Sequence, residues 1–96
     1  MTKQRSEYIY DLVGIIRKIK PNKIKHRMGL DLEVELSNYS EISTIKVFQD
    51  KLKEPTIWTD LTNKNFLDKR FIFYCQNYYG HYHLVSWKEL TNHGSN

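Results

Sequence analysis

Apolar and acidic residues alternate strictly over residues 30–36 of this chain. Leucine or valine occupies each even position, and aspartate or glutamate occupies positions 31, 33 and 35. A period of two is typical of a strand with one buried and one solvated face. Four further segments, rich in apolar, β-branched and aromatic residues, also predict strands. These segments are residues 8–20, 43–48, 70–75 and 82–87.

Polar segments separate the predicted strands. We expect a loop over residues 21–29 and turns over residues 37–40 and 76–80. The longest connection covers the 17 residues 49–65, and three apolar residues in it recur at helical spacing. The connection therefore predicts one or two short helical turns. The three residues are Ile57, Trp58 and Leu61.

The predicted order is three strands, a short helical connection and a two-stranded hairpin. In a chain of this length, the order favours an all-β fold with a small helical connection, namely a five-stranded Greek-key OB-fold barrel. Gly14 lies inside the first strand, where glycine marks a bulge or a tight bend of the kind that a small barrel needs. A small SH3-like barrel is the main alternative, although its connections would not need the 17-residue insertion.

The composition fits one globular domain. The chain has 96 residues, of which 27% are charged and 14% aromatic, so it can bury a modest core and is not a disordered tail. We expect an OB-fold domain over residues 1–90 and a flexible tail over residues 91–96. The single cysteine, Cys75, allows no intrachain disulfide and lies in an apolar run, so we interpret it as a small buried hydrophobe.

Targeting and membrane signals do not stand out in the sequence. It shows no secretory signal pattern and no apolar run of about 18 residues. We therefore expect an intracellular protein without a membrane partner, nuclear if the source is eukaryotic.

Positive charge is concentrated in one segment. The chain has 15 basic and 11 acidic residues, and residues 17–27 contain six of the bases and no carboxylate. A basic segment beside a β-scaffold favours contact with the phosphates of a nucleic acid, although a solvated loop would have the same composition. The candidate phosphate contacts are Arg17, Lys18, Lys20, Lys23, Lys25 and Arg27.

Tyrosines surround the predicted turn between the last two strands. Flat aromatic side chains in a turn can stack on bases, at about 1–3 kcal/mol per base. Tyr78 and Tyr79 are adjacent, so at least one should be exposed for contact with a base or a protein. Tyr74 and Tyr82 are further stacking candidates, with a place in the core or wall of the barrel as the equal alternative.

Several of these segments also resemble known proteins. Residues 11–16 followed by Pro21, the alternating residues 30–36, and residues 45–52 with Phe48-Gln49-Asp50 are similar to OB-folds of the replication protein A large subunit and of telomere-end-binding proteins. The resemblance covers about residues 8–88. It implies binding of single-stranded DNA in replication, repair or telomere protection, or assembly with other OB-fold subunits.

The third strand carries two further candidates. If Ile45 and Val47 point inward, Phe48 is exposed beside Lys46 and can act as a stacking platform, unless it packs against the helical connection. Lys46 can also neutralise part of the neighbouring acidic row. Trp58 and Trp87 we interpret as core residues.

The acidic row at positions 31, 33 and 35 argues against the simplest binding surface. Asp31, Glu33 and Glu35 should project together from the strand on which this kind of OB-fold commonly holds DNA, and they would repel phosphates. The chain then binds nucleic acid through its loops only, or presents the row to a basic protein partner.

Catalysis and metal binding find little support. His81 and His83 share one side of a strand, but the only further histidine with suitable spacing is His93 in the predicted tail. The acidic row lacks a nucleophile, a partner base and a glycine-rich phosphate loop. We therefore expect neither an enzyme nor a cofactor.

The sequence as a whole favours an OB-fold domain that binds single-stranded nucleic acid, with DNA preferred over RNA. The alternative is a protein-interaction OB-fold subunit of a replication-protein-A-like or telomere-capping complex, in which Tyr78, Tyr79 and Phe48 form the partner surface. An RNA-binding or tRNA-binding module is the third interpretation.

Overall fold

The computed structural model describes residues 8–24, 27–37, 41–63 and 65–90. The predicted order of three strands, a helical connection and a hairpin is confirmed. The elements are β1 (Tyr10–Ile24), β2 (Arg27–Leu36), β3 (Ile42–Phe48), the 3₁₀ turn η1 (Gln49–Lys51), α1 (Pro55–Asn63), β4 (Arg70–Tyr78) and β5 (His81–Glu89).

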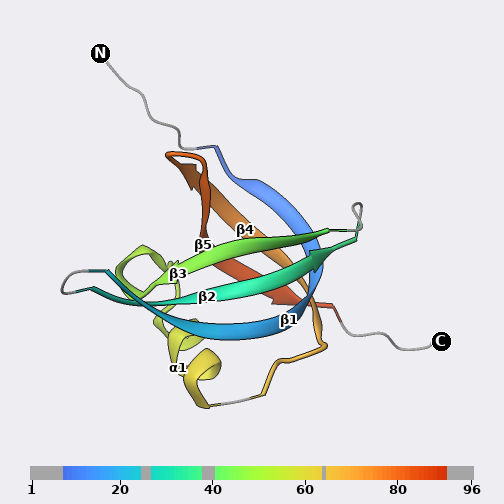
Figure 1. Cartoon of the computed structure of the whole chain (residues 1–96), viewed down its shortest axis with the longest axis horizontal. Coiled ribbons are helices and arrows are strands. Elements are labelled where there is room, and N and C mark those ends of the chain that lie inside the picture. The colour runs from blue at the N-terminus through green and yellow to red at the C-terminus, as the bar shows by residue number, and fades with distance from the viewer. Residues whose placement is uncertain (1–7, 25–26, 38–40, 64, 91–96) are drawn as a thin grey trace.

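The five strands form one closed sheet in the order β1-β2-β3-β5-β4. All neighbours are antiparallel except β3 and β5, which pair in parallel. The long strand β1 closes the sheet, because residues 10–15 pair with β4 and residues 14–24 pair with β2. Figure 1 shows α1 beside one end of the sheet, whereas the start of β1 lies next to the turn between β4 and β5.

Gly14 lies where β1 pairs with both of its neighbours. A Cβ atom there would lie 2.6 Å from the Glu35 carbonyl oxygen and 2.6 Å from a Val34 methyl group, so only glycine allows β2 this close. The bulge that the sequence associated with this glycine lies at Arg17, where the register shifts between Ile16 and Lys18. Gly14 thus permits a close approach, and the irregularity follows three residues later.

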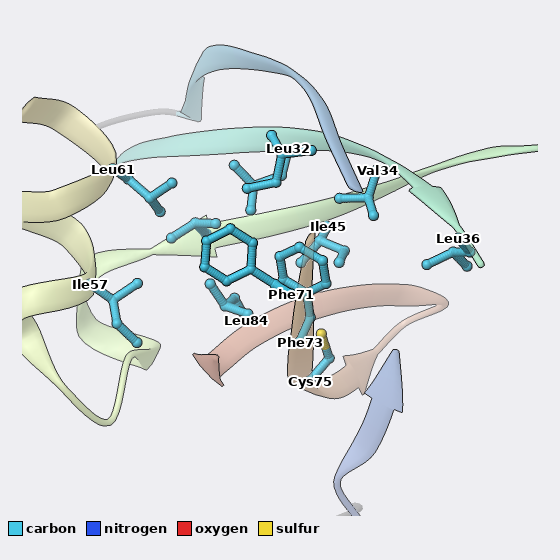
Figure 2. Packing of buried hydrophobic residues seen from close by; sticks show 12 residues of the cluster. Leu32, Val34, Leu36, Ile45, Ile57, Leu61, Phe71, Phe73, Cys75 and Leu84 are labelled. Atoms are coloured by element: carbon cyan, nitrogen blue, oxygen red, sulfur yellow. The ribbon is translucent and has the colours of Figure 1, made fainter. Parts of the chain in front are cut away.

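The core fills the inside of the closed sheet. The alternation of β2 holds, because Leu32 and Val34 are fully buried and Leu36 nearly so. Figure 2 shows side chains from the strands and from α1 pointing toward one another. The labelled core residues are Leu32, Val34, Leu36, Ile45, Ile57, Leu61, Phe71, Phe73, Cys75 and Leu84.

Both tryptophans and the cysteine lie where the sequence predicted. Trp58 and Trp87 pack against the core, and the Trp87 ring stacks on Phe71 with a centroid distance of 4.2 Å. Cys75 is fully buried, and its burial raises the pKa of the thiol to about 12. The Cys75 side chain therefore acts as a core hydrophobe.

The hairpins are tighter than the sequence predicted. The expected loop over residues 21–29 is wrong, because β1 continues through Pro21 to Ile24 and pairs with β2 from Arg27 onward. Pro21 lies in the part of β1 that pairs with β2 alone, and such an edge tolerates a residue without an N–H. Likewise, the expected turn over 76–80 is reduced to Tyr79 and Gly80, because β4 extends to Tyr78.

Two predicted segments fall partly or wholly outside the described residues. The expected turn over residues 37–40 falls mostly outside the described residues, although the Ser37 N–H donates to the Val13 carbonyl oxygen at 2.8 Å. The predicted tail over residues 91–96 lies outside them entirely. In the part of the chain that the structure describes, no helix has the length and apolar character needed to span a bilayer.

Candidate functional site

The turn between β4 and β5 presents Tyr79 to solvent. Tyr79 and Gly80 both have positive φ angles, of 54° and 84°, as a two-residue type I′ turn requires. The Gly80 N–H donates to Oδ1 of Asn77 at 3.1 Å and fixes the turn. Tyr79 is 99% exposed, as expected for at least one of the two adjacent tyrosines.

A hollow of about 330 Å³ lies beside this turn and combines positive charge with aromatic rings. It brings together the start of β2, the end of β3 and the β4–β5 hairpin, which are far apart in the sequence. We call it the basic-aromatic hollow. Its lining residues are Arg27, Lys46, Phe48, Tyr78, Tyr79, His81 and His83.

Phe48 forms the floor of this hollow and is not an exposed platform. Only 3% of Phe48 is exposed, so the predicted exposure is wrong. Its register partner Gly29 has no side chain, and the Phe48 ring lies so close to Gly29 that a Cβ atom there would be 2.6 Å from the ring. The Arg27 guanidinium covers the ring at 4.2 Å from its centroid, and the His83 ring stacks on it at 5.7 Å.

Arg27 is held in place from two sides. In addition to the Phe48 ring, its Nη2 contacts Oδ1 of Asp50 at 2.6 Å. The hydrogen bond from Arg27 lowers the pKa of the Asp50 carboxyl. Because both groups are largely exposed, a phosphate could compete with Asp50 for the guanidinium.

Tyr78 forms the wall of the hollow next to η1. Its hydroxyl donates to Oε1 of Gln76 at 2.6 Å, and its ring meets His83 edge-on at 5.1 Å. The Lys51 ammonium lies 4.3 Å from the centre of the Tyr78 ring. Sequence reasoning missed Lys51, although its position just after the aromatic end of β3 was a usable signal.

His83 lies between two rings and among cations. Burial is the main cause that lowers the pKa of its imidazole, and the positive charges of Lys51, His81, Lys46 and Arg27 lower it further. Its Nδ1 atom is buried without a hydrogen-bond partner among the described residues. The cations on several sides of His83 give a positive local potential, which favours an anionic ligand.

The acidic row of β2 is present but its charges are compensated. Each carboxylate has a basic partner on a neighbouring strand, so the repulsion expected from the row is much reduced. The pairs are Arg17–Glu35 at 2.9 Å, Lys20–Glu33 at 2.7 Å and Lys46–Asp31 at 3.7 Å. The hydrogen bond with Lys20 lowers the pKa of Glu33 and raises that of Lys20.

The described bases of the predicted segment do not all lie around one hollow. Arg17 contacts Glu35 and, at 2.7 Å, Asp68, and both contacts raise the pKa of its guanidinium. Arg17 and Lys18 line a separate hollow of about 640 Å³ beside the end of α1. Among the described residues of the segment, only Arg27 lines the basic-aromatic hollow.

The remaining predicted contacts lie elsewhere. Lys23 is exposed near the tip of the β1–β2 hairpin, and Lys25 falls outside the described residues. Tyr74 is half-buried opposite Asp11 and Ser86. Tyr82 is partly buried against the core and also lines a hollow next to Gly80 and His81.

A metal site is not assembled in the described part of the chain. There, no three side chains of histidine, cysteine, aspartate or glutamate lie close enough to share an ion. His81 and His83 do face the same hollow, together with cations that would oppose metal binding. Comparisons of the chain with protein-family models, with curated proteins and with solved structures give no match.

Proposed function

We propose that this chain is an OB-fold domain. The closed order β1-β2-β3-β5-β4, the parallel β3–β5 pair and the helix between β3 and β4 support this assignment. The long first strand, which pairs with two neighbours, gives further support. In such a fold, the connections after β1 and between β4 and β5 flank the ligand groove.

We infer that the domain binds single-stranded nucleic acid, with DNA preferred over RNA, in replication, repair or telomere maintenance. The observation that carries this proposal is that Arg27 and Lys46 line one hollow with Tyr78 and Tyr79. The Lys51 ammonium adds a further cation against the Tyr78 ring. Cations attract the phosphates, and an exposed ring stacks on a base whatever its identity. The role is one of binding and involves no catalysis.

Tyr79 is the residue on which the proposal is tested most directly. A type I′ turn prefers asparagine before glycine, so Tyr79→Asn should keep or slightly raise the free energy of unfolding. If the ring stacks on a base, the same variant should lose about 1–3 kcal/mol of affinity for oligothymidylate. Fluorescence anisotropy and urea unfolding measure the two quantities separately.

Two outcomes of the Tyr79→Asn experiment would contradict the proposed binding of nucleic acid at this turn. Unchanged oligonucleotide affinity in Tyr79→Asn would remove the turn from the site. If that variant also lost association with a co-purifying protein, the protein-interaction subunit would be the better interpretation. The fully exposed Tyr79 ring is the observation that favours protein interaction as the second candidate function.

The salt dependence tests the cations of the hollow. Replacing Arg27 and Lys51 by glutamine should flatten the slope of log affinity against log salt by about 0.7 per lost phosphate contact. Lys88→Gln is the matched control, because Lys88 is exposed near the end of β5 and outside the hollow. Equal slopes in the double variant and the control would exclude these two phosphate contacts.

A further inference from the structure

A second hollow continues from the basic-aromatic hollow toward the start of β1. It measures about 450 Å³ and shares Lys46 and His81 with the first, so the two are adjacent. Hydroxyl groups of β3 supply hydrogen-bonding capacity along it. Its lining residues are Asp31, Ser43, Thr44, Lys46, Gly80, His81 and Tyr82.

Charge in the second hollow is compatible with a phosphate backbone. The one carboxylate in its lining, Asp31, faces Lys46 at 3.7 Å and accepts a hydrogen bond from Asn22 at 2.8 Å. The negative charge is thus already compensated. Lys46 and His81 line both hollows. They therefore lie where the phosphate backbone of a bound strand would pass from one hollow to the other.

Aromatic rings continue beyond the second hollow. Tyr82, in its lining, meets Tyr10 edge-on at a centroid distance of 5.6 Å, and Tyr10 meets Tyr8 edge-on at 4.7 Å. Tyr8 is 65% exposed and Tyr10 is 37% exposed. Figure 1 shows the start of β1 next to the β4–β5 turn. Residues of this turn line both hollows.

We propose that Tyr8 and Tyr10 extend the binding track, so that a single strand held in the basic-aromatic hollow crosses the second hollow and stacks bases on them. The proposal rests on the proposed function. We infer that its occupant is single-stranded nucleic acid. The cations and hydroxyl groups of the hollows can bind phosphates, and the exposed rings beyond them can stack on bases. A purely apolar partner surface would lack the polar middle section.

Oligonucleotide length separates this extension from the first hollow. Affinities are measured for oligothymidylates of about 3 to 16 nucleotides, close to the range of OB-fold site sizes. For the wild type, affinity should rise with length until the track is filled. Tyr8→Ala should match the wild type with the shortest oligonucleotides and bind the longest about tenfold more weakly, the loss expected for one stacked base.

Leu67→Ala serves as the control, because Leu67 is also exposed but lines the hollow beside α1. It should match the wild type at every length. Equal affinities of Tyr8→Ala and wild type at all lengths would overturn the extension. A uniform loss at all lengths would also overturn it, since Tyr8 would then act on the first hollow.

Cross-linking in the unmodified protein gives a test that does not depend on the folding of a variant. An oligothymidylate with 5-iodouracil at one end or the other is irradiated in the complex, and the linked peptides are identified by mass spectrometry. One end should link to Tyr8 or Tyr10, and linkage of neither end to them would contradict the extension. If the wild type binds no oligonucleotide at all, the proposed function itself fails.

Discussion

At the scale of single residues, the environment of Phe48 decides the character of the candidate site. Strand alternation places Phe48 beside Lys46 and His83, yet the ring is covered by Arg27 and rests on Gly29. The ring that remains fully exposed at this hollow is then Tyr79. Gly29 and Arg27, two positions apart on β2, therefore bury a Phe48 ring that strand alternation alone would leave exposed.

Gly29→Ala should disturb both the fold and the site. A Cβ atom at residue 29 would lie 2.6 Å from the Phe48 ring and 2.8 Å from the Val47 carbonyl oxygen. We expect a loss of about 1–3 kcal/mol in the free energy of unfolding, as for overpacking elsewhere. Urea unfolding measures the loss, and Gly29→Ala combined with Phe48→Leu should recover part of it. No recovery would indicate that the clash with backbone dominates.

Cys75 should be unreactive in the folded protein. The side chain is fully buried and the pKa of the thiol is raised to about 12, so the thiolate fraction near pH 8 is on the order of one in ten thousand. An aromatic disulfide reagent should therefore modify Cys75 rapidly in denaturant. In buffer, the reaction should be limited by the rate at which the protein unfolds and exposes the thiol. Rapid modification of the native protein would contradict this burial.

At the scale of elements, β1, β2 and β3 share a ladder of ion pairs. Arg17, Lys20 and Lys46 each face one carboxylate of β2. The ladder explains how a strongly basic segment and an acidic row coexist on one side of a small sheet. It also ties up cations that a nucleic acid would otherwise reach.

Glu33→Gln combined with Glu35→Gln should tighten binding of single-stranded DNA, because it frees the charge of Lys20 and leaves Arg17 paired with Asp68 alone. The gain should be larger at low salt than near 0.15 M, where the Debye length is about 8 Å. The free energy of unfolding should fall only slightly, since the pairs are solvent-exposed. Anisotropy titrations at both salt concentrations provide the measurement. A loss of affinity would show that the carboxylates hold the bases in a binding geometry.

At the scale of the whole molecule, the positive charge does not gather at one loop, although the sequence concentrates six of the 15 bases in residues 17–27. Arg17 and Lys20 of the basic segment are paired along the sheet, whereas Arg27 of the same segment lies with Lys46, Lys51 and His81 around His83. The sheet closes so that these groups come from β2, β3, η1 and β5. Closure therefore concentrates a positive potential that no single segment carries.

Folding stability should decrease as the pH falls from about 7 to 5. The pKa of His83 is lowered in the folded protein, so the unfolded chain binds a proton first as the pH drops through its ordinary value near 6.5. His83 therefore contributes stability that is present above that value and lost below it. Urea midpoints across this pH range measure the effect, which His83→Gln should reduce. His81→Gln, at an exposed position, is the control and should change the profile less.

The sequence by itself determined the order of the helix and strands and which of their side chains face the core. Alternation over residues 30–36 and the helical spacing of Ile57, Trp58 and Leu61 are local properties, set by backbone periods of two and 3.6 residues. They predicted the buried side of β2, and they placed α1 in the connection of residues 49–65. The predicted core roles of Trp87 and Cys75 follow from apolar character alone.

Only the tertiary structure decided the strand ends and the groups that meet. The extension of β1 through Pro21 depends on pairing with β2, and the parallel β3–β5 pair joins segments with α1 and β4 between them. Closure of the sheet then places Arg27 over Phe48 and next to Tyr79 in one hollow. Composition shows which charges and rings a chain possesses, but long-range pairing sets which charges neutralise one another and which remain available to a ligand.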